Sequence, residues 1–295
     1  YVCSAYFESK NCCREMLRAM CDEKPILALM EPEPQRGGLS PEELRTGHLP
    51  ALPSRFAKWG LTAEMAEWGF EPPSAETVFE ALFEAQPIEW NRIGHFQDVT
   101  MRLIAERLLP TELHRATTID NEIASHANEP RPMKKPGGKS RFHIYASPLN
   151  PGALELVEEV ASERGMQLNA PSSVLVTTEP ALLGASEHFL LYLTAQTWTR
   201  GKASEELADE VTRAMDLGMN MLLAHEMPGV GGQAARHGCE FGAFFSNPDG
   251  ATPNSLLKRG IYSKIAIPLK GGEWRTASLA IMGWELSMSR EQAEA

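Results

Sequence analysis

The sequence predicts an α/β protein with two domains, each built on a doubly wound parallel sheet. Short apolar segments alternate along the chain with amphipathic helical segments, which is the pattern of βα units on a sheet covered on both faces. One stretch of the chain repeats another without a gap. The length of 295 residues also fits two domains of ordinary size.

The elements are clearest in the second half of the chain. Short apolar runs predict strands at residues 142–145, 174–177, 189–194, 221–224 and 265–269. Apolar residues at helical spacing predict a helix beginning near Pro151 and further helices at residues 204–217 and 274–286. These elements alternate as βα units do, so we expect one parallel sheet here.

A linker is predicted at residues 113–140. Its clearest part, between Ala127 and Ser140, is rich in Pro, Gly and Lys and has no apolar periodicity. We therefore predict a first domain at residues 1–112 and a second at residues 141–290.

The composition is that of a globular protein, with 43% apolar and 23% charged residues. The net charge of -11 argues against nucleic acid as a partner, because phosphates need a basic surface. The most apolar run, residues 189–195, is too short to span a membrane. Five cysteines without metal-ligand spacing predict free thiols and a cytoplasmic location. Since the chain starts with Tyr1 and carries no signal peptide, we expect it to begin inside a longer reading frame.

An internal repeat is the most informative feature. Residues 9–31 align on residues 204–226 at a constant offset of 195 (204 − 9). The identical pairs are Ser9/Ser204, Glu15/Glu210, Arg18/Arg213, Ala19/Ala214, Met20/Met215, Leu27/Leu222 and Glu31/Glu226. The same unit is therefore predicted to occur twice, with chance similarity between two amphipathic helices as the alternative.

The flanks of the repeat extend the match. Upstream, residues 1–4 are matched with residues 191–194. Downstream, a Glu-Trp pair precedes the last helix of each copy, at residues 89–90 and 273–274. The first copy then lacks its opening strands and helices.

Residues 1–33 resemble the middle of a Toll/interleukin receptor (TIR) domain. In that family a strand ends in a small hydroxyl residue, and an aromatic residue, a Ser-x-x-Cys-x-x-Glu helix start and a Pro-Ile strand follow. Here these features are Ser4, Tyr6, Ser9, Cys12, Glu15 and residues 25–30. Residues 87–109 resemble the last strand and helix of the family, after a long stretch at residues 35–79. The resemblance implies a flavodoxin-like fold, and it reaches the second copy through the repeat.

The second copy departs from the family in one loop. Residues 176–188 (VTTEPALLGASEH) stand where the family has a charged, glycine-bearing loop after its second strand. This departure argues against TIR–TIR docking through that loop and against a family-type nucleotide pocket in the second copy.

The resemblance implies a chemistry for Glu15 and its counterpart Glu210. Some TIR domains cleave the nicotinamide–ribose bond of NAD, and a glutamate in this helix is essential to them. Breaking that bond develops oxocarbenium character on the ribose, which a positioned carboxylate stabilises. The start of a helix after a parallel strand also opens onto the sheet edge where ligands bind. The alternative is an ordinary helix glutamate near the positive end of the helix dipole.

Glu31 and Glu226 end the strands that follow these helices, on the same sheet edge. A second carboxylate near the first would raise the pKa of one of them and supply a general acid. A solvated acid at the strand end is the alternative. The other residues predicted to contact NAD are Ser4, Tyr6, Ser9, Thr194, Trp198 and Ser204. NAD is predicted as a substrate, and no resident cofactor is predicted.

Residues 225–242 form the most glycine-rich part of the chain. Gly229, Gly231 and Ala234 match the GxGxxA dinucleotide fingerprint, but their late position in the sheet favours a tight surface loop. No metal is predicted, because no standard zinc spacing is matched by the potential ligands nearby, His225, His237, Cys239 and Glu240.

Three functions stay open. The first is an intracellular signalling protein that acts through TIR-like assembly, with other TIR-like domains or with itself, and hydrolyses NAD. The second is a catalytically inactive TIR-like interaction module, and the third is a nucleotide-binding enzyme using residues 229–242. The first two differ in whether the two glutamates of a copy converge on a cleft that admits a nucleotide.

Overall fold

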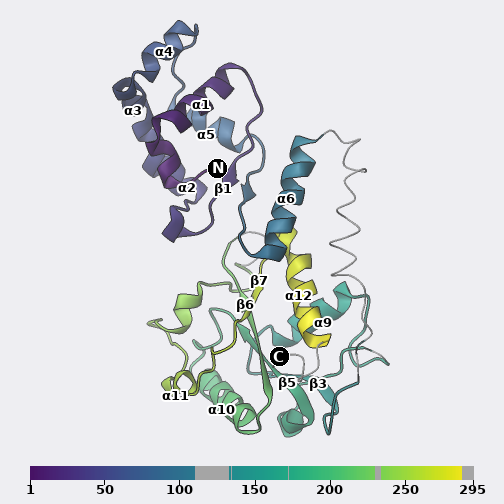
Figure 1. The fold of residues 1–295 in the computed structure, drawn as a ribbon. Helices are drawn as coiled ribbons and strands as arrows, with labels where there is room; N and C mark the ends of the chain where they lie inside the picture. The colour runs from purple at the N-terminus through teal and green to yellow at the C-terminus, as the bar shows by residue number, and fades with distance from the viewer. Residues whose placement is uncertain (110–132, 134, 172, 230–233, 288–295) are drawn as a thin grey trace. The chain divides into compact units, whose positions relative to one another are not determined.

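The computed structural model describes residues 1–109, 133, 135–171, 173–229 and 234–287. The chain divides into two compact units, residues 1–118 and 119–295 (Figure 1). Most of the predicted linker, residues 113–132 and 134, lies outside the described residues. No described helix combines the length and the apolar character needed to cross a membrane.

The second unit is built on a five-stranded parallel sheet. Its strands are β3 (Phe142–Ala146), β4 (Val176–Thr177), β5 (Ser186–Leu193), β6 (Asn220–Glu226) and β7 (Ile267–Leu269). They lie in the order β4-β3-β5-β6-β7, and every neighbouring pair is parallel. Numbered within the unit, the order is 2-1-3-4-5, so the chain starts inside the sheet and winds outward in both directions. The predicted α/β class with a parallel sheet is confirmed.

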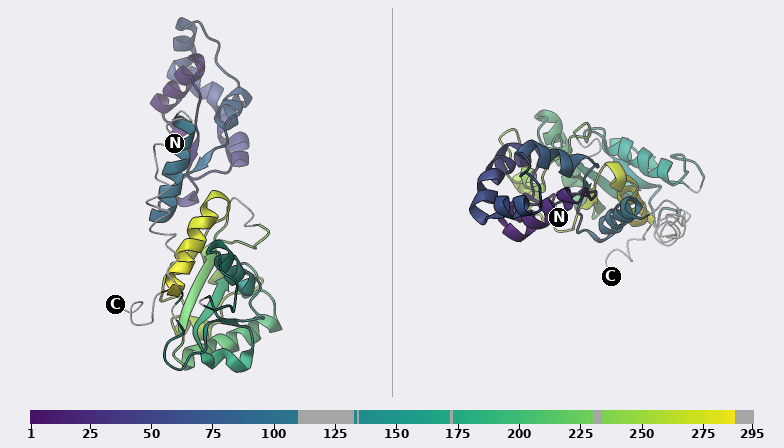
Figure 2. Two further views of the ribbon diagram at one scale, coloured as in Figure 1. Left: turned by 90° about the vertical axis from the view of Figure 1, so that its right-hand side faces the viewer. Right: turned by 90° about the horizontal axis from the view of Figure 1, so that it is seen from above.

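Helices cover both faces of this sheet (Figures 1 and 2). They are α9 (Ala153–Glu163), α10 (Lys202–Asp216) and α12 (Arg275–Ser287), with shorter η5 (Pro180–Ala185), η6 (Phe241–Phe244), α11 (Asn254–Lys258) and η7 (Gly272–Trp274). Leu190 and Leu222 share one core with α9 and α12, whereas Leu191 and Leu223 share the other with α10. Alternation along each strand therefore assigns every side chain to one of two faces.

The first unit contains only a small parallel sheet among its described residues. β1 (Leu29–Met30) pairs with β2 (Ile88–Glu89), and Val2 forms a parallel bridge to Met30. Its longer helices are α1 (Lys10–Cys21), α3 (Leu52–Trp59), α4 (Leu61–Glu67), α5 (Ala75–Phe83) and α6 (Gly94–Leu108). Its short helical elements are η1 (Ser4–Glu8), η2 (Pro34–Arg36), α2 (Pro41–Glu43), η3 (Leu44–His48) and η4 (Leu49–Ala51).

The stretch between β1 and β2 is a set of short helices rather than a loop. Leu49, Phe56 and Leu61 from these helices are fully buried and share a core with Phe7 and Leu17. This packing supplies apolar burial that the small sheet cannot supply alone.

The strand register corrects one detail of the predicted repeat. Val2 bridges Met30, and Leu193 pairs with His225. Since Met30 and His225 are equivalent at the offset of 195 (225 − 30), Val2 is equivalent to Leu193. Tyr1 therefore corresponds to Tyr192, so the predicted match of residues 1–4 with 191–194 was wrong by one position.

Candidate functional site

A buried charge cluster lies at the carboxyl edge of the sheet in the second unit. Glu226, the last residue of β6, is fully buried. Arg275, the first residue of α12, donates from Nη1 to its Oε1 and Oε2 at 3.2 and 3.0 Å. The hydroxyl of Tyr192 on β5 donates to Oε2 at 2.7 Å. We call these three residues the second-unit Tyr–Glu–Arg cluster.

A second carboxylate completes the environment of Arg275. The Nε of Arg275 donates to Oε1 of Glu159 on α9 at 2.8 Å, and the Nη2 of Arg275 also contacts Glu159. Burial by itself would lower the pKa of Arg275, but the hydrogen bonds to Glu159 and the charge of Glu226 outweigh it and raise that pKa. Burial raises the pKa of Tyr192, and the neighbouring Glu226 raises it further. Arg275 therefore stays charged and ties β6 to α9 and α12.

The first unit contains the same combination. Arg92 donates from Nη1 to Oε1 of the buried Glu31 at 2.9 Å, and its Nη2 lies 2.6 Å from Oε2. Nη2 also donates to the hydroxyl of Tyr1 at 2.8 Å, and that hydroxyl donates to Glu31. Burial would raise the pKa of Glu31, but the bonds from Arg92 and Tyr1, with the backbone N–H of Glu33, lower it to about 2. We call these residues the first-unit Tyr–Glu–Arg cluster.

The glutamates and tyrosines of the two clusters match in the predicted repeat, whereas their arginines stand at different distances from the strand before them. Glu31 and Glu226 match at the offset of the repeat, and the strand register makes Tyr1 equivalent to Tyr192. Sequence reasoning identified the glutamates but missed the arginines. The register also corrects the predicted match of the two Glu-Trp pairs. Met30 pairs with Glu89 and its counterpart His225 pairs with Pro268, so Glu89 corresponds to Pro268 and not to Glu273.

The predicted catalytic Glu210 lies apart from Glu226. Glu210, on α10, accepts a hydrogen bond from the hydroxyl of Tyr145 at 3.0 Å, and Tyr145 belongs to the core on the α10 face. Glu226 bonds to Tyr192, which belongs to the core on the α9 and α12 face. The two carboxylates therefore lie on opposite faces of the sheet and do not converge on one site.

In the first unit Glu15 is exposed on α1, whereas Glu31 is buried. Glu31 faces the guanidinium of Arg92, which stabilises its charged form. The predicted rise in pKa, which a carboxylate pair would cause, is therefore wrong for Glu31.

Three of the other predicted site residues form side-chain hydrogen bonds to backbone groups nearby in the chain. The Ser9 hydroxyl caps α1 by accepting from the Cys12 N–H at 3.4 Å, and the Tyr6 hydroxyl donates to the Cys12 carbonyl at 3.1 Å. The Ser204 hydroxyl donates to the Thr197 carbonyl at 3.0 Å.

One helix start and one backbone contact differ from the predicted site. The helix predicted to start at Ser204 begins at Lys202, because Gly201 with φ of 56° precedes it and allows the chain to turn earlier. The Ser4 N–H donates to the carbonyl of Gly37 at 2.8 Å, which ties the start of η1 to the end of η2.

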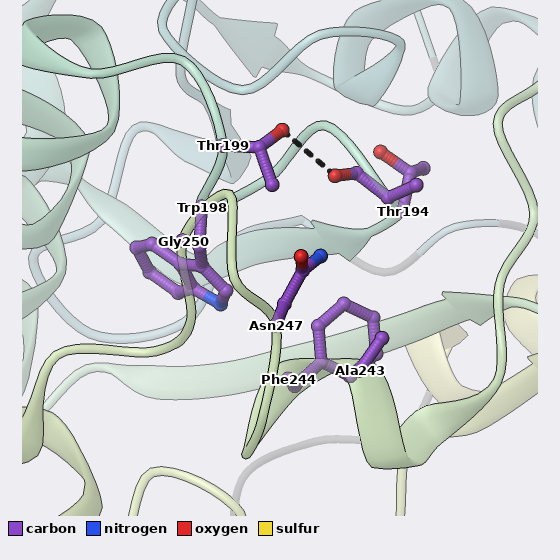
Figure 3. Close-up of a pocket in the computed structure, with 8 residues that line it drawn as sticks. Thr194, Trp198, Thr199, Ala243, Phe244, Asn247 and Gly250 are labelled. Carbon is purple, nitrogen blue, oxygen red and sulfur yellow. Dashed lines mark hydrogen bonds between the residues drawn. The ribbon is translucent and has the colours of Figure 1, made fainter.

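Thr194 and Trp198 line a small hollow at the end of β5 (Figure 3). Its other lining residues are Ala195, Thr199, Ala243, Phe244, Asn247 and Gly250. The indole Nε1 of Trp198 donates to the hydroxyl of Tyr262 at 3.1 Å. The hollow leaves about 10 Å³ for the centres of water-sized spheres, which is room for about one water molecule. It is too small for a dinucleotide.

The glycine-rich segment is partly outside the described residues, which exclude 230–233 and with them Gly231. His225 is buried, with Nε2 2.8 Å from the Cys239 carbonyl oxygen and its ring 5.3 Å from that of Phe241. Burial lowers the pKa of His225. Within the described parts of the chain, no three His, Cys, Asp or Glu side chains gather as metal ligands. All five cysteines are free.

Comparisons with protein-family models, curated proteins and solved structures find no match to this chain. Its function has to be inferred from the geometry of its two units.

Proposed function

We propose that the chain is a TIR-like interaction module of a cytoplasmic signalling protein, and that its second unit does not hydrolyse NAD. The observation that carries this proposal is the separation of Glu210 from Glu226 on opposite faces of the sheet. Glycoside cleavage with paired carboxylates needs both groups on either side of one bond. Here one carboxylate is fully buried and neutralised by Arg275.

The flavodoxin-like fold is proposed for both units. Support in the second unit comes from its parallel strand order, which is 2-1-3-4-5 within the unit. Support in the first unit comes from its own Tyr–Glu–Arg cluster and the equivalent parallel pairing around β1. The TIR resemblance of residues 1–33 and the repeat extend the proposal to a tandem pair.

Assembly with other TIR-like domains, or with a second copy of the chain, is the proposed activity. The carboxyl edge is the usual ligand site of a doubly wound sheet. In both units an ion pair between the protein's own residues lies at that edge, at the end of one strand. Binding of other domains through outer surfaces therefore agrees better with the geometry than binding of a small ligand at this edge.

NAD hydrolysis is a second candidate function for the first unit, favoured by the exposure of Glu15. Its counterpart Glu210 accepts a bond from Tyr145 on β3. A free carboxylate remains able to stabilise positive charge on a ribose.

The two functions are separated by nicotinamide release from the full chain and from its Glu15→Ala and Glu210→Ala variants, with folding confirmed by circular dichroism. We expect no release that depends on Glu210. Release abolished by Glu210→Ala would overturn the inactive assignment of the second unit, and release abolished by Glu15→Ala would establish the second candidate.

Assembly is tested by light scattering on the same full chain over a rising concentration series. We expect the mean mass to rise above 32.6 kDa as concentration increases. A constant monomer mass, alone and with an added TIR domain, would contradict the interaction module.

A further inference from the structure

The closing helix of the first unit is weakly attached. Of the 15 residues of α6, only Phe96 and Thr100 are buried. Met101 and Leu108 on the same helix are 49% and 67% exposed. Helical stability in proteins comes mainly from packing of an apolar face, and α6 buries little of one.

The closing helix of the second unit is attached more firmly. Leu279, Met282 and Leu286 of α12 are all at most 4% exposed and join a core shared with α9. The carbonyl of Gly283 also accepts a hydrogen bond from Nη1 of Arg164 at 2.7 Å. The two closing helices thus differ in how much of their apolar surface is buried against the rest of their unit.

The arginine contacts differ in the same direction. Arg275 is 11% exposed and joins carboxylates from two elements, β6 and α9. Arg92 is 34% exposed, and both of its carboxylate partners, Glu31 and Glu33, follow β1. No second helix is tied to α6 by this contact, and water reaches it more easily.

The start of α6 lacks a side-chain cap. Its N-cap residue, Ile93, has no side-chain oxygen to accept from the first helical N–H groups. The α1 and α5 helices of the same unit are capped by Ser9 and Ser74. The contacts at the start of α6 include the cluster at Arg92, the bond from the Thr100 hydroxyl to the Glu89 carbonyl and the burial of Phe96.

We propose that α6 is a releasable helix, which separates from the first unit while the rest of that unit stays folded, and that Arg92 bound to Glu31 and Tyr1 is the latch that holds it. Local openings of this kind occur where few apolar contacts hold a segment. The proposal goes beyond the interaction function and does not depend on it.

Hydrogen exchange followed by mass spectrometry on the full chain tests the latch. We expect peptides from α6 to exchange faster than peptides from α12 in the unmutated protein. Arg92→Ala should speed exchange in α6 by at least about tenfold, because Glu31 then loses its cation, and should leave α1 unchanged.

Arg36→Ala is the matched control, because Arg36 pairs with Glu33 at 2.6 Å in the same region without being bonded to Glu31. We expect it to leave α6 exchange unchanged. Equal protection of α6 and α12, or no response of α6 to Arg92→Ala, would overturn the proposal. Equal acceleration of α1 and α6 would do so too, since Arg92 would then hold the whole unit.

Discussion

Arg275 binds both carboxylate oxygens of Glu226, from a position 49 residues further along the chain. Glu226 is fully buried, and its carboxylate also accepts a hydrogen bond from the Tyr192 hydroxyl. The pair fixes α12 to β6, which lies next to β7, the strand that precedes α12 in the chain.

Replacing Arg275 should therefore be strongly destabilising. Arg275→Met leaves Glu226 buried without its cation, and we expect the free energy of unfolding of the second unit to fall by about 3–5 kcal/mol. Urea unfolding followed by circular dichroism measures this. Arg259→Met, which removes a surface pair with Asp216 at 2.7 Å, should change it by less than about 1 kcal/mol. Equal effects of the two substitutions would contradict the buried role of Arg275.

Gly152 is required by Tyr192. A Cβ at residue 152 would lie 2.7 Å from Cε1 of the Tyr192 ring, and the ring is held by its bond to Glu226. Gly152 also has φ of 80°, where an L side chain is strained.

We expect Gly152→Ala to lower the melting temperature clearly more than Gly165→Ala. Gly165 has φ of 64° but open space around its missing Cβ, so alanine there adds only backbone strain of about 1–2 kcal/mol. The collision with Tyr192 should add about 1–3 kcal/mol at residue 152. Differential scanning calorimetry measures the two melting temperatures. Equal decreases in the two variants would show that the Tyr192 ring moves to make room for the new Cβ.

Burial of His188 should make the second unit sensitive to acid. Burial lowers the pKa of His188 to about 4, with smaller contributions from His143 and Lys264. As pH falls from about 6.5 to 4, the His188 imidazole binds a proton in the unfolded chain but not in the folded unit. Stability is then complete above about pH 6.5 and falls by at most about 3 kcal/mol towards pH 4.

Chemical unfolding at several pH values checks this direction. His188→Gln should flatten the dependence between pH 6.5 and 4, because no buried imidazole remains. His95→Gln, at an exposed position on α6, should leave the dependence unchanged. A slope that survives in His188→Gln would assign the acid sensitivity to another group.

Cys13 should be the slowest thiol of the first unit to react. It is fully buried, and burial followed by the neighbouring Cys12 raises its pKa to about 11. The thiolate is the reactive form, so iodoacetamide at pH 8 should modify Cys3, Cys12 and Cys21, which are partly exposed, before Cys13. Peptide mass spectrometry resolves the four sites. Early modification of Cys13 in the folded protein would show that α1 opens.

Strands and helices of the second unit could be read from local periodicity. Residues 189–194 and 221–224 were predicted as strands, and they lie in β5 and β6 with ends shifted by a few residues. The helix predicted at residues 274–286 is α12 within one residue at each end. Alternation and helical spacing depend on neighbours in the chain, so sequence contains them directly.

The helices between residues 35 and 83 could not be read in this way. They are short, and the longest of them, α5, has nine residues. Two turns of helix contain too few apolar positions for a period to stand out from chance. They are stable because Phe56 and Leu61 pack in the core of the first unit.

The sequence by itself therefore determined the α/β class, the approximate positions of the main elements of the second unit and the match of Glu31 with Glu226 in the repeat. Only the tertiary structure decided what those glutamates do. It placed an arginine on each of them, and it put Glu210 on the other face of the sheet. The physical reason is that periodicity is set by neighbours in the chain. The partner of a buried charge is instead set by which distant segments the folded sheet brings together.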